Sequence, residues 1–200
     1  MSRLSTYFFL LLLCVFIACG QAAADTETDI SSPETEVPAV PNEDNTTISD
    51  VDDDPYLISN GEFLGMRPGS PLDDFVGGLR KGTLQTGEGD FPVYYIDGAE
   101  GEELGYLVPD PRDGAMIGDI IVTSQDVVTE AGIRVGVNFE ELQNRLGRPL
   151  EVHGSEIESR TYAVRDGFSY RIGDAHDNYE LEASQVDPTA EVLTIELRRQ

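Results

Sequence analysis

The chain has 200 residues, with 38 acidic side chains against 13 Lys and Arg, which gives a formal net charge of −25 at pH 7. A surface of this sign repels nucleic acid and anionic lipid headgroups, so neither is expected as a partner. The only cysteines are Cys14 and Cys19, so no disulfide bond can crosslink the rest of the chain.

The first 18 residues have the pattern of a signal peptide. Their apolar run of twelve residues, Tyr7 to Ala18, suits a signal-peptide core and is short for a membrane-spanning helix. The segment Phe16 to Cys19 resembles the bacterial lipobox, whose cysteine becomes the lipidated first residue of the mature protein. We therefore predict cleavage before Cys19 and a lipid anchor on it. The alternatives are an uncleaved N-terminal anchor and ordinary secretion with cleavage after Ala22, Ala23 or Ala24.

Residues 19–54 are predicted to be the lipidated cysteine followed by an acidic, disordered spacer. From Asp25 to Asp54 the chain has eleven acids, no Lys or Arg and no aromatic residue. Such a segment cannot bury enough apolar surface to offset the entropy of ordering, and charge repulsion extends it. The spacer is expected to hold a folded domain away from the membrane.

Residues 55–200 are predicted to form a single globular domain made of two repeats, at about 56–124 and 125–199. A motif recurs at an offset of 67 residues, with the pattern G-[apolar]-R-x-G-x-x-[Leu/Phe]-acid-acid. Its defining residues are Gly65, Arg67 and Gly69 in the first copy and Gly132, Arg134 and Gly136 in the second. Internal repeats of this kind usually reflect duplicated supersecondary structure.

Each copy of the motif is predicted to lead into a short helix. The first helix is expected at 71–79 with Ser70 as its N-cap, and the second at 138–146 with Asn138 as its N-cap. Strands are predicted at 91–96, 104–108, 117–123, 160–164, 168–172, 179–183 and 191–197. The predicted fold is therefore α+β, a tandem repeat of a short helix and an antiparallel β-meander, with the helices packed on one face of the sheet.

The hairpin around Asp166 and Gly167 has two alternatives. A two-residue turn would pair Val164 with Ser169 and put the apolar residues of the two strands on opposite faces. A three-residue loop pairs Val164 with Phe168 and keeps them on one face, with Gly167 as a left-handed bulge residue. We predict the three-residue loop.

The second motif and its surroundings carry a family resemblance. A Gly-Ile turn, a short helix that ends near Leu-Gly and an antiparallel meander resemble the tandem-repeat lipoproteins and inhibitors grouped with the β-lactamase inhibitor protein and the small outer-membrane assembly lipoproteins. The segment Gly132 to Pro149 carries most of the similarity, and Ile120 to Ser124 adds to it. The resemblance implies a protein-binding role, and it supplies no catalytic residue.

Several polar residues are candidates for a functional site. His176 lies between Asp174 and Asp177, but a solvated loop is favoured over a metal site, and His153 stands alone. The carboxylates of 97–103 suit calcium but lack EF-hand spacing. Arg67 and Arg134 are interpreted as braces for nearby acids or carbonyls in preference to binding residues. No catalytic residue, metal or cofactor is predicted.

The sequence therefore predicts a non-catalytic envelope lipoprotein, anchored to the membrane through Cys19, whose open sheet face or loops bind a protein partner. Its expected location is the outer membrane of a Gram-negative bacterium, on the periplasmic or the surface side. The alternatives are a calcium- or polysaccharide-binding surface module and an envelope hydrolase. A convergent cleft of carboxylates or a His–acid pair would favour the hydrolase.

The anchor prediction is tested by Cys19→Ser, which removes the thiol that the lipid would modify. We expect the variant to leave the membrane fraction and to lose metabolic labelling by a fatty acid. Wild-type protein that takes up no label, together with unchanged membrane retention of the variant, would contradict the prediction.

Overall fold

The computed structural model describes residues 54–199 apart from residues 88, 148, 157 and 158. All of them belong to the second of two units, Asn45–Gln200. Cys19, the predicted signal peptide and all but the last residue of the predicted spacer lie outside the described residues. No helix in the described part of the chain is long and apolar enough to cross a membrane.

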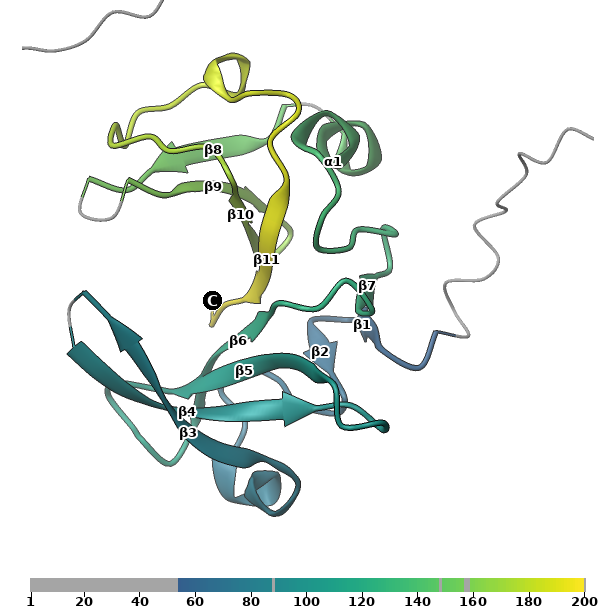
Figure 1. The fold of residues 1–200 in the computed structure, drawn as a ribbon, viewed down its shortest axis with the longest axis vertical. Coiled ribbons are helices and arrows are strands. Elements are labelled where there is room, and N and C mark those ends of the chain that lie inside the picture. The colour runs from purple at the N-terminus through teal and green to yellow at the C-terminus, as the bar shows by residue number, and fades with distance from the viewer. Residues whose placement is uncertain (1–53, 88, 148, 157–158, 200) are drawn as a thin grey trace, which may run out of the picture. The chain divides into compact units, whose positions relative to one another are not determined.

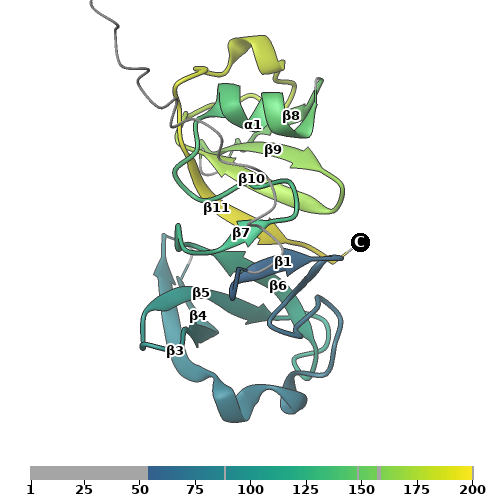
Figure 2. The ribbon, with the colours of Figure 1, turned by 90° about the vertical axis from the view of Figure 1, so that its right-hand side faces the viewer.

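Eight antiparallel strands form the main sheet, in the order β3-β4-β5-β6-β11-β10-β9-β8 (Figures 1 and 2). Its strands are β3 (Arg80–Thr86), β4 (Gly89–Asp97), β5 (Glu103–Pro109), β6 (Ile117–Val122), β8 (Glu151–Gly154), β9 (Thr161–Arg165), β10 (Phe168–Ile172) and β11 (Val192–Leu197). The pairing of β6 with β11 joins the first four strands to the last four. A small sheet contains β1 (Leu57–Ser59), β2 (Glu62–Phe63) and β7 (Val128–Thr129), with β1 parallel to β7.

Helical structure is limited to one α-helix and three short 3-10 turns in the described residues. The helix α1 (Phe139–Leu146) begins where it was predicted, because the Asn138 side chain accepts a hydrogen bond from the backbone N–H of Glu141 at 2.8 Å. It ends before Gly147, whose φ of 81° suits glycine. The 3-10 turns are η2 (Leu72–Asp74), η3 (Val76–Gly78) and η4 (Ala183–Gln185).

The predicted α+β tandem repeat of helix and meander is wrong. The fold is mostly β, and the helix expected at 71–79 is replaced by η2 and η3. Phe75 interrupts them with φ −120° and ψ −19°, and Gly77 and Gly78 each cost a helix about 1 kcal/mol relative to alanine. The two motifs share their turns, in which Gly65, Gly69, Gly132 and Gly136 all have positive φ. They also share a backbone bridge to a later segment, Pro71 to Met116 in the first and Asn138 to Glu191 in the second.

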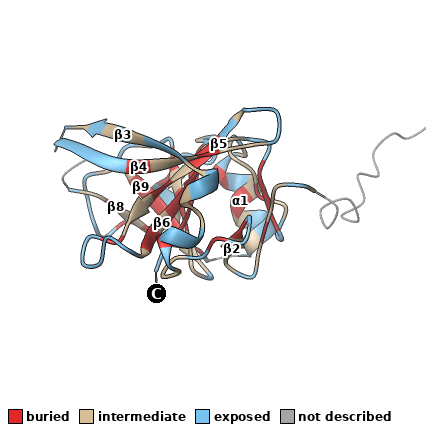
Figure 3. Ribbon diagram, turned by 90° about the horizontal axis from the view of Figure 1, so that it is seen from below, coloured by how far each residue is buried: buried red, intermediate tan, exposed pale blue. Residues whose placement is uncertain are grey.

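Some strand predictions were wrong, because the alternation of apolar residues did not match the strand pairing. The strands β3 and β8 were missed, and both are edge strands of the main sheet. Figure 3 shows β3 with exposed and intermediate residues, so this strand has no buried face that a sequence pattern would reveal. The strand expected at 179–183 is instead a loop that leads into η4, and only Leu181 in it is buried.

The three-residue loop predicted for the β9–β10 hairpin is also wrong. Phe168 pairs with Arg165 and Ser169 with Val164, so the turn has two residues, both with positive φ. This is the type I′ geometry that Asp-Gly favours. The prediction assumed one buried face, whereas Tyr162 and Ser169, on the face opposite Tyr170, are buried too.

The hydrophobic core lies on one face of the main sheet. Across the strands, the paired residues on this face are Ile96, Gly105, Val122, Ile195, Tyr170, Ala163 and Val152. The side chains of this row form one buried cluster with Phe139 and Leu142 of α1, which lies in front of the sheet in Figure 2. A Cβ at Gly105 would overlap the carbonyl oxygen of Ile121, so only glycine fits there.

Leu142 tests whether α1 depends on this core. The helix has eight residues, too few to persist alone in water, and Leu142 is fully buried. We expect Leu142→Ala to lower the free energy of unfolding by roughly 2–5 kcal/mol in chemical denaturation. Leu193→Ala, at an exposed position, is expected to change it by less than about 0.5 kcal/mol. Equal effects of the two substitutions would contradict this packing.

Candidate binding surface

The face of the main sheet that points away from the core, here called the outer face, is polar and aromatic. One row of paired residues on it runs Tyr95, Tyr106, Ile121, Glu196, Ser169, Val164 and Glu151. The neighbouring row contains Thr194, Arg171, Tyr162 and His153. In Figure 1 the first four strands and the last four diverge from the join between β6 and β11, on the side away from α1. Side chains from both groups therefore contribute to this face.

Glu196 organises the centre of the outer face. The residue is only 8% exposed, and its carboxylate accepts hydrogen bonds from Arg198 Nε at 3.0 Å and Nη2 at 2.6 Å. The Thr194 hydroxyl donates to the other carboxylate oxygen at 3.1 Å. A buried carboxylate is tolerated when it is paired and hydrogen bonded in this way. The contacts also fix the position of the Arg198 guanidinium.

Arg198 and three rings form a stacked cluster, which we call the Tyr162 cluster. The guanidinium carbon of Arg198 lies 5.1 Å from the centre of the Tyr162 ring, a cation–π distance. His153 stacks on Tyr162 and also contacts Tyr179, with 5.6 Å between ring centres in both cases. Burial, and then the charge of Arg198, lower the pKa of His153. The histidine is therefore a neutral ring within the cluster at pH 7.

Tyr106, in the first group of strands, is affected by charged side chains of the second group. It lies on β5, and its pKa is raised by burial and then by the charge of Glu196 on β11. Arg160 and Arg171 act in the opposite direction, and Tyr162 on β9 also contributes. The electrostatic effect of a charge decreases rapidly with distance in water, so we infer that these groups lie in one partly desolvated region. The phenol stays protonated at pH 7 and is available as a hydrogen-bond donor.

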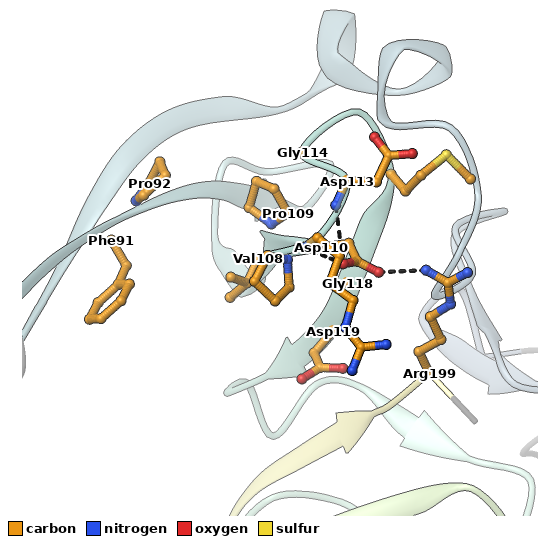
Figure 4. A pocket seen from close by; sticks show the side chains of 13 residues that line it. Phe91, Pro92, Val108, Pro109, Asp110, Asp113, Gly114, Gly118, Asp119 and Arg199 are labelled. Carbon is orange, nitrogen blue, oxygen red and sulfur yellow. Dashed lines mark hydrogen bonds and ion pairs between the residues drawn. The ribbon is translucent and has the colours of Figure 1, made fainter.

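A groove of about 1180 Å³ lies beside this region, and we call it the Phe91 groove (Figure 4). Phe91, Pro92, Val108 and Pro109 form its apolar side, while Asp110 and Arg199 lie on the opposite side. Phe91 is 40% exposed although it is a large apolar side chain. Asp119 also lines the groove. Burial acts to lower the pKa of Arg198, and the charge of Glu196 and then that of Asp119 raise it. The groove and the Tyr162 cluster are therefore neighbouring parts of one surface.

Asp110 anchors the loop on the far side of the groove. It is only 6% exposed, and it accepts hydrogen bonds from the backbone N–H groups of Arg112 and Asp113 at 2.7 and 3.4 Å. The Arg199 guanidinium donates to it at 2.5 Å, which attaches the end of the chain to this loop. These contacts, led by the Arg112 amide and the Arg199 side chain, lower the pKa of Asp110.

The two arginines of the repeated motif contact acids and carbonyls. Arg67 pairs with Glu62 at 3.1 Å. Arg134 pairs with Asp54 at 2.6 Å and donates to the backbone oxygens of Gln125 and Asp126. Neither residue lies on the outer face.

Other polar candidates hold loops together. His176 Nε2 lies 3.0 Å from Asp174, so the fold does contain a His–acid pair. The Asp174 carboxylate also accepts the backbone N–H of Asp187, and this contact is the main cause of its lowered pKa. The His176 carbonyl accepts the N–H of Ser155, so the pair connects two loops to β8.

Three of the four carboxylates of 97–103 have side-chain partners among the described residues. Asp97 and Glu103 pair with Arg80 at 2.9 and 3.0 Å, and Glu102 accepts the Tyr56 hydroxyl at 2.7 Å. Among the described residues, no group of three or more His, Cys, Asp and Glu side chains has an arrangement that would hold a metal ion.

No protein-family model matches this chain, and no curated protein matches it. Among solved structures, it is similar to the uncharacterized protein yfeY from Escherichia coli, with a TM-score of 0.44 and 16% sequence identity. The alignment covers 67% of this chain and 93% of that chain. A likeness at this level carries no functional argument.

Asp110 provides a test of the groove wall. A carboxyl whose pKa is lowered by folding stabilises the protein above its unfolded pKa of about 4, and that contribution is lost as the pH falls through the lower folded pKa. We expect Asp110→Asn to lower the melting temperature at pH 7, with the difference shrinking below about pH 4. Asp177→Asn, at an exposed position, is the control. A difference that is independent of pH would contradict the ionic role.

Proposed function

We propose that this chain is a lipid-anchored lipoprotein of the cell envelope that binds a protein partner through its outer face and catalyses no reaction. The pattern before Cys19 supports the anchor, and the composition of the outer face supports the binding role. The outer membrane of a Gram-negative bacterium remains the proposed location, in line with the family resemblance of the second motif.

The observation that carries the binding proposal is the combination of tyrosines and a fixed arginine on the outer face. Tyr95, Tyr106, Tyr162 and Tyr179 come from three strands and one loop. Tyrosine and arginine are enriched among the residues that dominate binding energy in protein interfaces. Because Glu196 already holds Arg198 in place, less side-chain entropy is lost when a partner binds.

The Phe91 groove adds an apolar recess beside these polar and aromatic groups. Interfaces typically place an apolar anchor of one partner in a recess of the other and surround it with polar contacts. Phe91 and Pro92 lie on β4, next to the edge strand β3, where both remain exposed. The groove is therefore suited to take an apolar side chain of the partner.

The alternatives have less support from the described residues. Three of the four carboxylates that suggested calcium already have partners in Arg80 and Tyr56. The His176–Asp174 pair that would favour a hydrolase is part of a loop connection. A polysaccharide would use the same aromatic side chains as a protein partner, and the experiment below distinguishes these two ligands.

A photocrosslinking amino acid in place of Tyr179 tests the proposal in intact envelopes. Tyr179 belongs to the Tyr162 cluster and is 66% exposed, so we expect protease-sensitive adducts with a discrete protein. The matched control is the same amino acid in place of Asn144, an exposed residue of α1 on the other side of the sheet. Phe91→Asp is expected to reduce the adduct yield about tenfold or more, because it places a charge in the apolar side of the groove.

Three outcomes would contradict the proposal. They are adducts from position 144 alone, no adduct from position 179, and adducts at 179 that resist protease but not glycosidase. The last outcome would identify a polysaccharide ligand.

A further inference from the structure

Seven of the ten arginines among the described residues form an ion pair with Asp or Glu, and Arg112, which forms none there, is exposed to solvent. Ion pairs with Asp or Glu are formed by Arg67, Arg80, Arg134, Arg145, Arg165, Arg198 and Arg199. Arg171 forms neither an ion pair nor a side-chain hydrogen bond within the described part of the chain. It is half-buried near the centre of the outer face, between Thr194 and Tyr162 on the neighbouring strands.

The missing partner matters because of where Arg171 lies. A half-buried guanidinium has lost part of its hydration, and this loss is costly unless a counter-charge replaces the water. Acids outnumber basic residues in this chain by 38 to 13, so an internal partner would have been easy to supply. The neighbouring carboxylate, Glu196, has both oxygens occupied by Arg198 and Thr194.

A second polar group without a partner lies next to Arg171. Ser169 is two residues away on β10 and on the same face, and it is only 2% exposed. Its hydroxyl has no hydrogen-bond partner among the described residues, which is uncommon for a buried polar atom. The Thr161 hydroxyl shares this property, but Thr161 pairs with Ile172 on the core face and cannot contribute here.

We infer that Arg171 and Ser169, flanked by Tyr162, form a binding site for a carboxylate on an acidic side chain of the protein partner. This inference rests on the proposed function. The guanidinium of arginine presents a planar fork of N–H donors that matches the two oxygens of a carboxylate. The Ser169 hydroxyl supplies a further donor once a neighbouring side chain turns aside.

Charge on the outer face favours a single carboxylate over a polyanion. Glu196 is paired with Arg198, so Arg171 is left without a counter-charge among the described residues of this face. The chain as a whole carries −25 and repels extended polyanions such as nucleic acid or an anionic membrane. An Asp or Glu side chain that projects from a protein satisfies the local charge without extending into the acidic surroundings.

The site is tested with a display library of random heptapeptides, selected on the full chain in detergent. We expect the enriched peptides to contain Asp or Glu. The best of these peptides is expected to bind the Arg171→Gln variant about 10- to 100-fold more weakly than the unsubstituted protein, because a charge-assisted hydrogen bond is lost. Ser169→Ala is expected to weaken binding by a smaller factor. Replacing the acid of the peptide by its amide and combining this with Arg171→Gln is expected to cause no further loss.

Arg145→Gln is the matched control, because it changes the net charge equally but lies on α1, away from the outer face. It is expected to alter the affinity less than twofold, and unchanged melting temperatures would show that Arg171→Gln is folded. Enriched peptides without acids, or equal affinity of the Arg171 and Arg145 variants, would overturn the inference. Displacement of the peptide by millimolar inorganic phosphate would also overturn it, since the site would then bind a free inorganic anion.

Failure of the carboxylate site and failure of the proposed function give different results. If crosslinking at position 179 captures a protein and Arg171→Gln leaves the adduct yield unchanged, the carboxylate site is wrong and the binding proposal stands. If peptides select Arg171 but envelopes yield no adduct at 179, the site binds carboxylates and the proposed partner at this face is wrong.

Discussion

The structure depends on a short pairing between β6 and β11. Three residue pairs join these strands, Ile120 with Leu197, Ile121 with Glu196, and Val122 with Ile195. Four of the six side chains point into the core and are almost fully buried, so hydrophobic burial holds the two groups of strands together. The other two point to the outer face, and one of them is the carboxylate that organises it. The join that completes the sheet thus also places the centre of the candidate site.

This arrangement explains how distant residues come to share one surface. Tyr106 and Arg171 are far apart in sequence, and they interact because β11, the last strand, pairs with a strand from the middle of the chain. Loop closure over such a span is entropically costly, so the core face must stabilise the sheet before the outer face can form. The outer face can then carry polar groups, such as Arg171, that contribute little to folding and remain available to a ligand.

The sequence was sufficient to predict those elements whose position is set by local residues. The Asn138 cap and Gly147 set the ends of α1, and apolar alternation located β11. Local signals failed at η2 and η3, where two glycines outweigh an apolar stripe, and at β3, whose residues lack a buried face. The outer face was not predictable, because the polar residues Thr194, Glu196 and Arg198 read as the solvated side of a strand. Only the pairing of β11 with β10 and β6 brings them to Arg171 and Tyr106.

The central claim is that the outer face, and not the face covered by α1, meets a partner in the cell. Hydroxyl-radical footprinting of intact envelopes, compared with the purified full chain, measures this most directly. We expect Tyr179 and Phe91, both exposed in the protein alone, to become protected in envelopes, while exposed residues of α1 react equally in both samples. Equal reactivity of Tyr179 and Phe91 in the two samples, or protection confined to α1, would contradict it.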